Sequence, residues 1–456
     1  MEHQNNELKQ YLVPGKTVHL IGIGGVSMRS LGPVLMRMGV RVTGSDRDAS
    51  SSTKELEEQG IKIIIGHYED NVVGADCVIR TSAVHDDNPE IVSAHRLGIP
   101  VFERAQAWGV IMQGYKDAIC ISGTHGKTTV TAMVTHIMME AQRDPTVMIG
   151  AYLPLIQSCH RVGQGDTIIL ESCEYCDSFL SFYPSLSVIL NIEEDHLDYF
   201  KDLKDIQKSF RKFAELASDR VLINGDDPHC LQAVDGLSYL TFGFGEQNII
   251  HGTNISSDWQ HLDVVCDGAF YCHLDLRVMG WHNAFDAIAA AGVAWMLGVP
   301  GQVVTDALRD FNGANRRMQF KGTYNGADLF DDFAHHPDEI RALIDVVKTL
   351  PYKRFVFVFQ PYTYTRTVSF FDDFVKELKR ADHLVLAEIC AARETDTLGI
   401  SSRHLQEKIE GSVYKETLPE VTEYLCSIAR EGDIIISSGC GDIYKAIEAM
   451  IENKEG

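Results

Sequence analysis

Positive charge is scarce in this sequence. Its 456 residues include 41 Lys and Arg against 64 Asp and Glu, which gives a formal net charge of −23. A surface with that balance repels a nucleic-acid backbone almost everywhere, so we expect no nucleic-acid partner. A local cationic pocket for a single nucleotide is still compatible with the composition.

Long hydrophobic runs and a leader-like start are also missing. The longest apolar stretch, from Ala284 to Pro300, contains Asp286 and falls short of the ~20 apolar residues that a membrane span needs. Residues 1–10 are polar, with no basic segment leading into an apolar one. Eleven cysteines in such a chain are typical of reduced thiols, and the CxxC pair Cys173–Cys176 has no second pair to complete a zinc site. We therefore expect a cytoplasmic protein without a membrane partner.

The order of apolar segments predicts an α/β fold. About three domains fit the length, and 45% apolar residues exclude disorder. Strand-length apolar runs alternate with helical stretches, which is typical of parallel sheets. The sequence predicts three α/β domains in series, over residues 1–113, 114–314 and 315–456.

A glycine-rich turn carries the strongest chemical signal. It reads Gly123-Thr-His-Gly-Lys-Thr-Thr129 and lies between a buried strand and a helix predicted over Lys127–Glu140. Such a turn wraps phosphates with backbone N–H groups, while the lysine neutralises their charge and the Thr128 hydroxyl suits Mg²⁺. The spacing is compressed, because Ile121 stands where the first glycine is usual, and a plain helix-capping turn is the alternative. The motif predicts a nucleoside triphosphate site made of Gly123, Thr124, His125, Gly126, Lys127, Thr128 and Thr129.

A carboxylate and an imidazole follow two strands of the same block. Glu171 ends a strand predicted over Thr167–Glu171, and His196 follows one predicted over Leu186–Ile192. Because parallel strands end at one sheet edge, both side chains are candidates for a metal ion at the phosphates. Imidazole is an unusual Mg²⁺ ligand, so a helix-capping role for His196 fits the residues equally well.

Another glycine-rich turn opens the chain. Gly22-Ile-Gly-Gly25 follows a strand, and Asp46 ends the next one. The pattern is a weak dinucleotide fingerprint that favours a diphosphate-containing ligand. A structural turn is one alternative. A nicotinamide dehydrogenase is another, but it leaves the loop at 123–129 unexplained.

The third block offers cations and imidazoles after its strands. Asp331-Asp-Phe-Ala-His-His-Pro337 follows one strand, and Arg366 follows another predicted over Arg354–Phe359. Arg316-Arg317 lies at the predicted linker, where a guanidinium can reach a phosphate. The imidazoles fit metal ligands, substrate contacts or helix caps. The turn Ser437–Asp442 is interpreted as structural.

Taken together, these motifs resemble the Mur ligase family over essentially the whole chain. The resemblance rests on His19–Gly25, Gly123–Thr129, Glu171–Phe179, Asn191–His196, Arg316-Arg317, Asp332–Pro337 and Thr365–Thr367. It implies a Rossmann-like first domain that binds a UDP-sugar, a central P-loop-type ATPase domain and a Rossmann-like third domain that receives an amino acid. The implied partners are ATP, Mg²⁺, UDP-N-acetylmuramate and L-alanine, with no obligate protein partner.

The resemblance also implies residue roles. Catalysis is assigned to Lys127, Glu171, His196, Arg317 and Asp332. Thr128, Glu171 and His196 are assigned to the metal, and Asn283, Arg317 and Asp332 join the glycine-rich loop at ATP. The UDP-sugar is assigned to Gly22, Gly24, Gly25, Asp46, Thr81, Ser82 and Ala83. L-alanine is assigned to His335, His336 and Arg366.

The reaction so implied is ATP-dependent amide-bond formation. The lactyl carboxylate of UDP-N-acetylmuramate is phosphorylated to an acyl phosphate, which the amine of L-alanine then attacks. There are two alternatives. One is a ligase that adds a recycled peptide, and the other is a nucleotide-binding paralogue without ligase turnover. The sequence departs from the family's usual pattern at Arg29, Asp286 and Tyr362.

Overall fold

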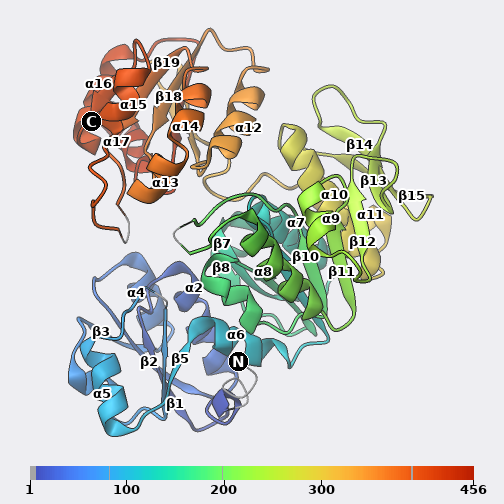
Figure 1. Ribbon diagram of the computed structural model, residues 1–456, viewed down its shortest axis with the longest axis vertical. Coiled ribbons are helices and arrows are strands. Elements are labelled where there is room, and N and C mark those ends of the chain that lie inside the picture. Colours follow the sequence, from blue (N-terminus) through green and yellow to red (C-terminus); the bar gives the residue numbers. More distant parts are fainter. Residues whose placement is uncertain (1–6, 82, 198, 392–393, 456) are drawn as a thin grey trace. The chain divides into compact units, whose positions relative to one another are not determined.

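The computed structural model describes residues 7–81, 83–197, 199–391 and 394–455 (Figure 1). These residues form three sheets flanked by helices, the three-domain α/β architecture that the sequence predicts. They divide into two compact units. The first comprises Met1–Asp195, Tyr199–Arg277 and Ala284–Phe311, and the second comprises His196–Asp198, Val278–Asn283 and Asn312–Gly456.

A five-stranded parallel sheet opens the first unit, in the order β3-β2-β1-β4-β5. Its strands are β1 (Thr17–Ile21), β2 (Arg41–Asp46), β3 (Lys62–Ile65), β4 (Cys77–Arg80) and β5 (Val101–Glu103). Its helices are α2 (Val26–Arg29), α3 (Leu31–Arg37), α4 (Ser51–Glu58), η1 (Glu69–Val72), α5 (Pro89–Leu97) and α6 (Arg104–Met112). The glycine-rich turn at 22–25 therefore leaves the central strand of this sheet.

A ten-stranded sheet follows, in the order β15-β14-β13-β12-β11-β10-β6-β9-β7-β8. Its strands are β6 (Asp117–Ser122), β7 (Thr146–Leu153), β8 (Ser158–Arg161), β9 (Thr167–Glu171), β10 (Leu186–Ile189), β11 (Arg220–Asn224), β12 (Leu240–Gly243), β13 (Ile250–Thr253), β14 (His261–Cys266) and β15 (Ala269–Asp275). Its helices are α7 (Lys127–Glu140), η2 (Pro154–Ile156), η3 (Tyr175–Ser181), α8 (Leu203–Glu215), α9 (Pro228–Ala233), α10 (Trp281–Met296) and α11 (Gly301–Arg309).

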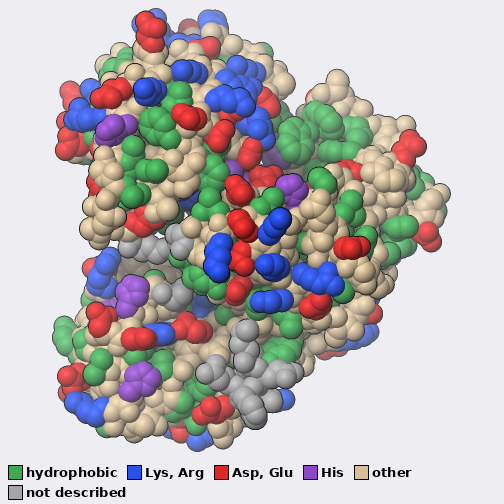
Figure 2. All heavy atoms as spheres, in the orientation of Figure 1, with side chains coloured by type: hydrophobic (Ala, Val, Ile, Leu, Met, Phe, Trp, Pro, Cys, Tyr) green, Lys and Arg blue, Asp and Glu red, His purple; other side chains and the backbone are tan. Residues whose placement is uncertain are grey.

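Parallel pairing brings the chemistry of this sheet to one edge. β6 lies between β9 and β10 and runs parallel to both. Its loop, Glu171 at the end of β9 and the segment after β10 therefore share the carboxyl edge. By contrast, α8 presents Lys and Arg side chains interleaved with Asp and Glu on the face that Figure 2 shows, the ordinary pattern of a solvated helix.

The second unit contains a six-stranded sheet in the order β16-β17-β21-β18-β19-β20. Its strands are β16 (Gln319–Tyr324), β17 (Ala327–Asp332), β18 (Arg354–Phe359), β19 (His383–Ala387), β20 (Val413–Lys415) and β21 (Asp433–Ser438). Its helices are α12 (Pro337–Val347), α13 (Tyr364–Ser369), α14 (Phe371–Leu378), α15 (Ser402–Lys408), α16 (Leu418–Ile428) and α17 (Tyr444–Glu455). All pairs are parallel except β16–β17.

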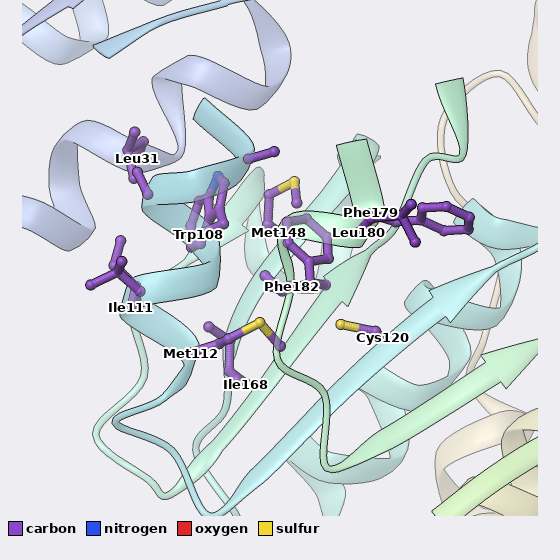
Figure 3. Close-up of a cluster of buried hydrophobic side chains, with 14 of the residues drawn as sticks. Leu31, Trp108, Ile111, Met112, Cys120, Met148, Ile168, Phe179, Leu180 and Phe182 are labelled. Atoms are coloured by element: carbon purple, nitrogen blue, oxygen red, sulfur yellow. The ribbon is translucent and has the colours of Figure 1, made fainter. Parts of the chain in front are cut away.

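The two sheets of the first unit share one apolar core. Figure 3 shows Trp108 and Met112 of α6 in the same buried cluster as Phe179 of η3 and Phe182, which follows η3. The backbones of α6 and η3 also lie close together, since a Cβ on Gly109 would collide with the carbonyl oxygen of Ser181. The first domain is therefore packed against the ten-stranded sheet through buried side chains and leaves no room for a larger residue at position 109.

None of the helices in the described ranges has the length and apolar content to cross a membrane.

Candidate active site

The glycine-rich loop follows β6 and leads directly into α7. Gly126 has φ +81°, a left-handed conformation, and a Cβ there would lie 2.7 Å from the Asp286 Oδ1 atom. Gly123 has φ +149°, and its Cβ would lie 2.9 Å from that of Leu190. Both glycines are therefore required by conformation and by space. The first turn of α7 leaves backbone N–H groups available to an anion.

Asn191, which follows the neighbouring strand β10, fixes the shape of this loop. Its side-chain oxygen accepts a hydrogen bond from the His125 N–H at 2.7 Å, and its amide donates to the His125 carbonyl at 3.1 Å. Its carbonyl accepts from the Thr124 N–H at 3.2 Å. The strand expected to reach Ile192 ends instead at Ile189, because the chain leaves the ladder to bind the loop. His125 Nε2 also lies 3.3 Å from Glu193 Oε2.

Lys127 is the half-buried cation of the glycine-rich loop. Its ammonium donates to the carbonyl oxygens of Gly123 and Thr124 and lies 3.1 Å from Glu174 Oε2. Burial alone would lower the pKa of Lys127, but Glu174 and neighbouring groups outweigh it and raise the pKa above its usual value. Lys127 therefore stays charged, and Glu174, 2% exposed, is its counter-ion. Sequence reasoning did not single out Glu174, since a carboxylate beside the lysine has no motif of its own.

Thr128 and Glu171 form a pair of oxygen donors beside the lysine. The Thr128 hydroxyl donates to Glu171 Oε1 at 2.9 Å, and Glu171 Oε2 accepts from the Gly150 N–H at 2.6 Å. A Cβ on Gly150 would lie 2.7 Å from Glu171 Oε1, so a larger residue there would displace the Glu171 carboxylate. Hydroxyl and carboxylate oxygens are the donors that Mg²⁺ prefers, so these two residues fit such an ion. Thr129 follows in α7 and is half-buried.

His196 belongs to the second compact unit and has φ +53°. Its approach to Thr128 and Glu171 therefore stays a prediction.

The first glycine-rich turn is tied to the end of the next strand. Asp46 Oδ2 accepts from the Gly24 N–H at 2.8 Å, and the carbonyl of Ser45 accepts from Gly22 N–H at 2.8 Å. Gly22 has φ +78°, and a Cβ there would lie 2.9 Å from Thr81 Cγ2. The structure thus brings the predicted UDP-sugar residues to one strand edge: Gly22, Gly24, Gly25, Asp46, Thr81 and Ala83. Ser82 lies outside the described residues.

Arg29, one of the three departures, has a structural role. Its guanidinium donates to Cys159 Sγ at 2.8 Å and to the Ser52 hydroxyl at 2.7 Å. It therefore links α2 to β8 of the central sheet and to the start of α4.

In the second unit, two adjacent arginines have different surroundings. Arg316 donates to Asp331 Oδ2 at 2.8 Å and to the carbonyls of Gly439 and Gly441, which makes it part of the fold. Both guanidiniums lie over the Phe333 ring, that of Arg316 at 5.0 Å and that of Arg317 at 5.4 Å. The ion pair of Arg317 is longer, with Nη1 4.0 Å from Glu339 Oε1. The left-handed φ angles of Arg316 and Met318, +62° and +45°, turn the chain sharply on both sides of Arg317.

Asp332 is buried beside Arg317. Its carboxylate accepts from the N–H groups of Met318 at 2.7 Å and Ala334 at 2.8 Å. Burial raises the pKa of Asp332, and Arg317 opposes that rise. The predicted nucleotide residue Asn283 lies in the segment 278–283 of the same unit, and its side-chain amide donates to the Met279 carbonyl at 2.8 Å.

The predicted alanine residues lie where β17 and β18 end. His336 begins α12 as its N-cap, and Glu339 accepts from the N–H groups of His335 at 3.0 Å and His336 at 3.3 Å. The His335 ring is 6.2 Å from that of Tyr362, so these two strand ends converge. Arg366 lies in α13, whose N-cap Thr363 has φ +66°. His336 is thus a cap, one of the alternatives that the sequence leaves open.

Comparison with known families decides the class of protein. The Mur ligase family matches along the chain in three successive parts: its catalytic domain at residues 17–116, its middle domain at 121–294 and its glutamate ligase domain at 316–441. The chain belongs to the Mur ligase family. This confirms the resemblance that the motifs carry.

Individual Mur ligases agree with this. The UDP-N-acetylmuramate–L-alanine ligase of Clostridium novyi is 43% identical over 449 residues, with 96% of this chain and 98% of the relative covered. The crystal structure of a UDP-N-acetylmuramate-alanine ligase from Thermotoga maritima matches with a TM-score of 0.82 at 27% identity, covering 96% of this chain and 99% of that one. A murein peptide ligase from Psychrobacter arcticus, at 21% identity, TM-score 0.74 and coverage of 96% and 98%, shares the fold.

Proposed function

We propose that this Mur ligase is an ATP-dependent enzyme that joins L-alanine to the lactyl carboxylate of UDP-N-acetylmuramate, a step in the synthesis of peptidoglycan precursors. The observation that carries the proposal is the Lys127 ammonium bound to two loop carbonyls, next to the Thr128–Glu171 pair. Full-length relatives at 39–43% identity that are named for this reaction support the substrate pair.

The chemistry requires a leaving group on the carboxylate. The lactyl carboxylate oxygen attacks the γ-phosphorus of ATP. The bond between the γ-phosphorus and the β,γ-bridging oxygen breaks, and ADP leaves. The alanine amine then attacks the acyl carbon and expels inorganic phosphate. Phosphoryl transfer needs positioning and charge neutralisation more than covalent help, and we assign the charge neutralisation to Lys127 and Arg317.

Mg²⁺ is part of this proposal, held by Thr128 and Glu171 with His196 as the third group. Bound there, it neutralises phosphate charge during transfer. The donor set supports the assignment, because the threonine hydroxyl and the Glu171 carboxylate already lie 2.9 Å apart. Asn283 and Asp332 are proposed as further nucleotide contacts.

The other two substrates are assigned to the outer domains. UDP-N-acetylmuramate is proposed to bind at the turn 22–25 with Asp46 and the end of β4, where N–H groups at the start of α2 suit a diphosphate. L-alanine is proposed to contact His335, His336 and Arg366. We further propose that the enzyme works in the cytoplasm, where its nucleotide substrates occur.

The test is phosphate release that depends on both UDP-N-acetylmuramate and L-alanine. With ATP, Mg²⁺ and UDP-N-acetylmuramate present, L-alanine should start release, whereas a free tripeptide with L-alanine at its N-terminus should not. Release with the tripeptide alone would assign the peptide-recycling reaction instead. ATP binding with no release in either mixture would contradict ligase activity.

A further inference from the structure

The edge hairpin of the central sheet gathers imidazoles and carboxylates outside the proposed active site. His261 and Asp263 of β14 face Asp275 and His273 of β15 as cross-strand partners. Because alternate residues of a strand share a face, all four side chains lie on one side of the hairpin. The intervening residues Leu262 and Leu274 are fully buried on the opposite side.

Three donor atoms of this group converge. Asp275 Oδ1 lies 2.8 Å from His261 Nδ1 and 3.2 Å from His273 Nε2. The three atoms lie within 4.8 Å of one another. Ligands about 2.1 Å from a tetrahedral ion are about 3.4 Å apart, so only small side-chain movements separate this arrangement from a coordination site.

The fourth residue orients one of the imidazoles. Asp263 Oδ1 lies 2.6 Å from His273 Nδ1, and Asp263 Oδ2 accepts from the Asn254 amide at 2.7 Å. When a carboxylate accepts a hydrogen bond from one imidazole nitrogen, the other nitrogen is unprotonated and can bind a metal ion. This is the usual arrangement around a histidine metal ligand. An ordinary surface ion pair does not need this second carboxylate with its own partner.

We propose that His261, His273 and Asp275 form a binding site for a transition-metal ion of the zinc class, with Asp263 as a positioning residue. Two imidazoles and one carboxylate match the preference of Zn²⁺ and Co²⁺ and not that of Mg²⁺, which takes oxygen ligands. Solvent completes the coordination, because the side chains are about half exposed. The ion joins β14 to the edge strand β15 (Figure 1).

Zn²⁺ titration of the full chain tests the site, with Mg²⁺ in excess and a chromogenic chelator reporting free Zn²⁺. The wild-type protein should bind one more equivalent than His261→Ala/His273→Ala. His95→Ala, which removes an exposed histidine of α5, should bind the same number as wild type. Equal stoichiometry in wild type and the double variant would overturn the proposal.

Two conservative variants keep the test valid if the double variant folds poorly. Asp275→Asn should lose the extra equivalent, whereas Asp263→Asn should retain it with affinity weakened about 10–100-fold. An unchanged affinity for Zn²⁺ in both Asp275→Asn and Asp263→Asn would also overturn the proposal. Because metal binding is measured without substrates, failure here says nothing against ligase activity, and failure of the ligase assay says nothing against the metal site.

Discussion

At the scale of single residues, Lys127 combines a catalytic assignment with a structural one. Replacing it by Met should abolish acceptor-dependent phosphate release, because the phosphate charge is no longer neutralised. It should also lower the free energy of unfolding by about 3–5 kcal/mol, since the buried Glu174 loses its counter-ion. Phosphate release and urea unfolding measure the two effects separately.

Glu174→Gln in the Lys127→Met background separates these roles. The double variant removes the uncompensated charge, so most of the lost stability should return while activity stays absent. Stability that fails to recover would show that Glu174 is not the main counter-ion. Ligase turnover in either variant would remove Lys127 from the proposed mechanism.

Arg317 and Arg316 provide a matched pair of neighbours. Arg317→Ala should lower kcat by roughly 1000-fold with little change in the KM for ATP, because its contact is proposed to form in the transition state. Arg316→Ala should mainly lower stability, since Arg316 binds Asp331 and two backbone carbonyls. Steady-state kinetics and thermal unfolding of both variants check the contrast. A larger kcat loss in Arg316→Ala would reverse the assignment.

At the scale of elements, the sequence predicts strands and helices best where periodic patterns are long. The helix Lys127–Glu140 and the strand Arg354–Phe359 are confirmed to the residue. The strand expected at Leu186–Ile192 is shorter, because Asn191 binds the loop instead of a neighbouring strand.

The site roles that the sequence did not predict share one physical cause. Glu174, Asn191 and Glu339 act through hydrogen bonds to backbone or through one buried ion pair. Such roles depend on which segments meet in space, and no spacing along the chain encodes them. The glycine-rich loop, which we propose as the phosphate site, could be found from the sequence because its glycines, lysine and threonine are contiguous.

Helix α7 carries a histidine whose burial makes stability depend on pH. Burial lowers the pKa of His136 to about 4, whereas an unfolded histidine titrates near 6.5. Below pH 6.5 the unfolded chain therefore binds more protons, and the stabilisation present at neutral pH is lost as pH falls toward 4.

The measurement is the difference in free energy of unfolding between wild type and His136→Gln across pH 7 to 4. This difference should change by up to about 1.4 kcal/mol per pH unit, the linkage value for one proton. The contributions of the other titratable groups are the same in both proteins and cancel. His95→Ala serves as the exposed control and should parallel wild type. A constant difference between wild type and His136→Gln would show that His136 is not held neutral by the fold.

At the scale of the whole molecule, three domains are organised as two compact units. The first two sheets share the core around Trp108, while the third sheet has separate cores on its two faces. Three domains followed from the order of strands and helices. Their grouping did not, because it depends on α6 meeting the segment after β9, where a Cβ on Gly109 would collide with the carbonyl oxygen of Ser181, and sequence periodicity reports only local pairing.

This grouping predicts two calorimetric transitions, one for each unit. Trp108→Ala should lower the midpoint of one transition only, with a loss of about 3–5 kcal/mol, and Phe359→Ala should lower only the other. Trp108→Phe is the matched control: it retains most of the apolar surface and removes an indole N–H that meets no acceptor within the described part of the chain. It should therefore cost much less than Trp108→Ala. If Trp108→Ala instead split off a third transition, the first two domains would unfold separately and their shared core would contribute little to cooperativity.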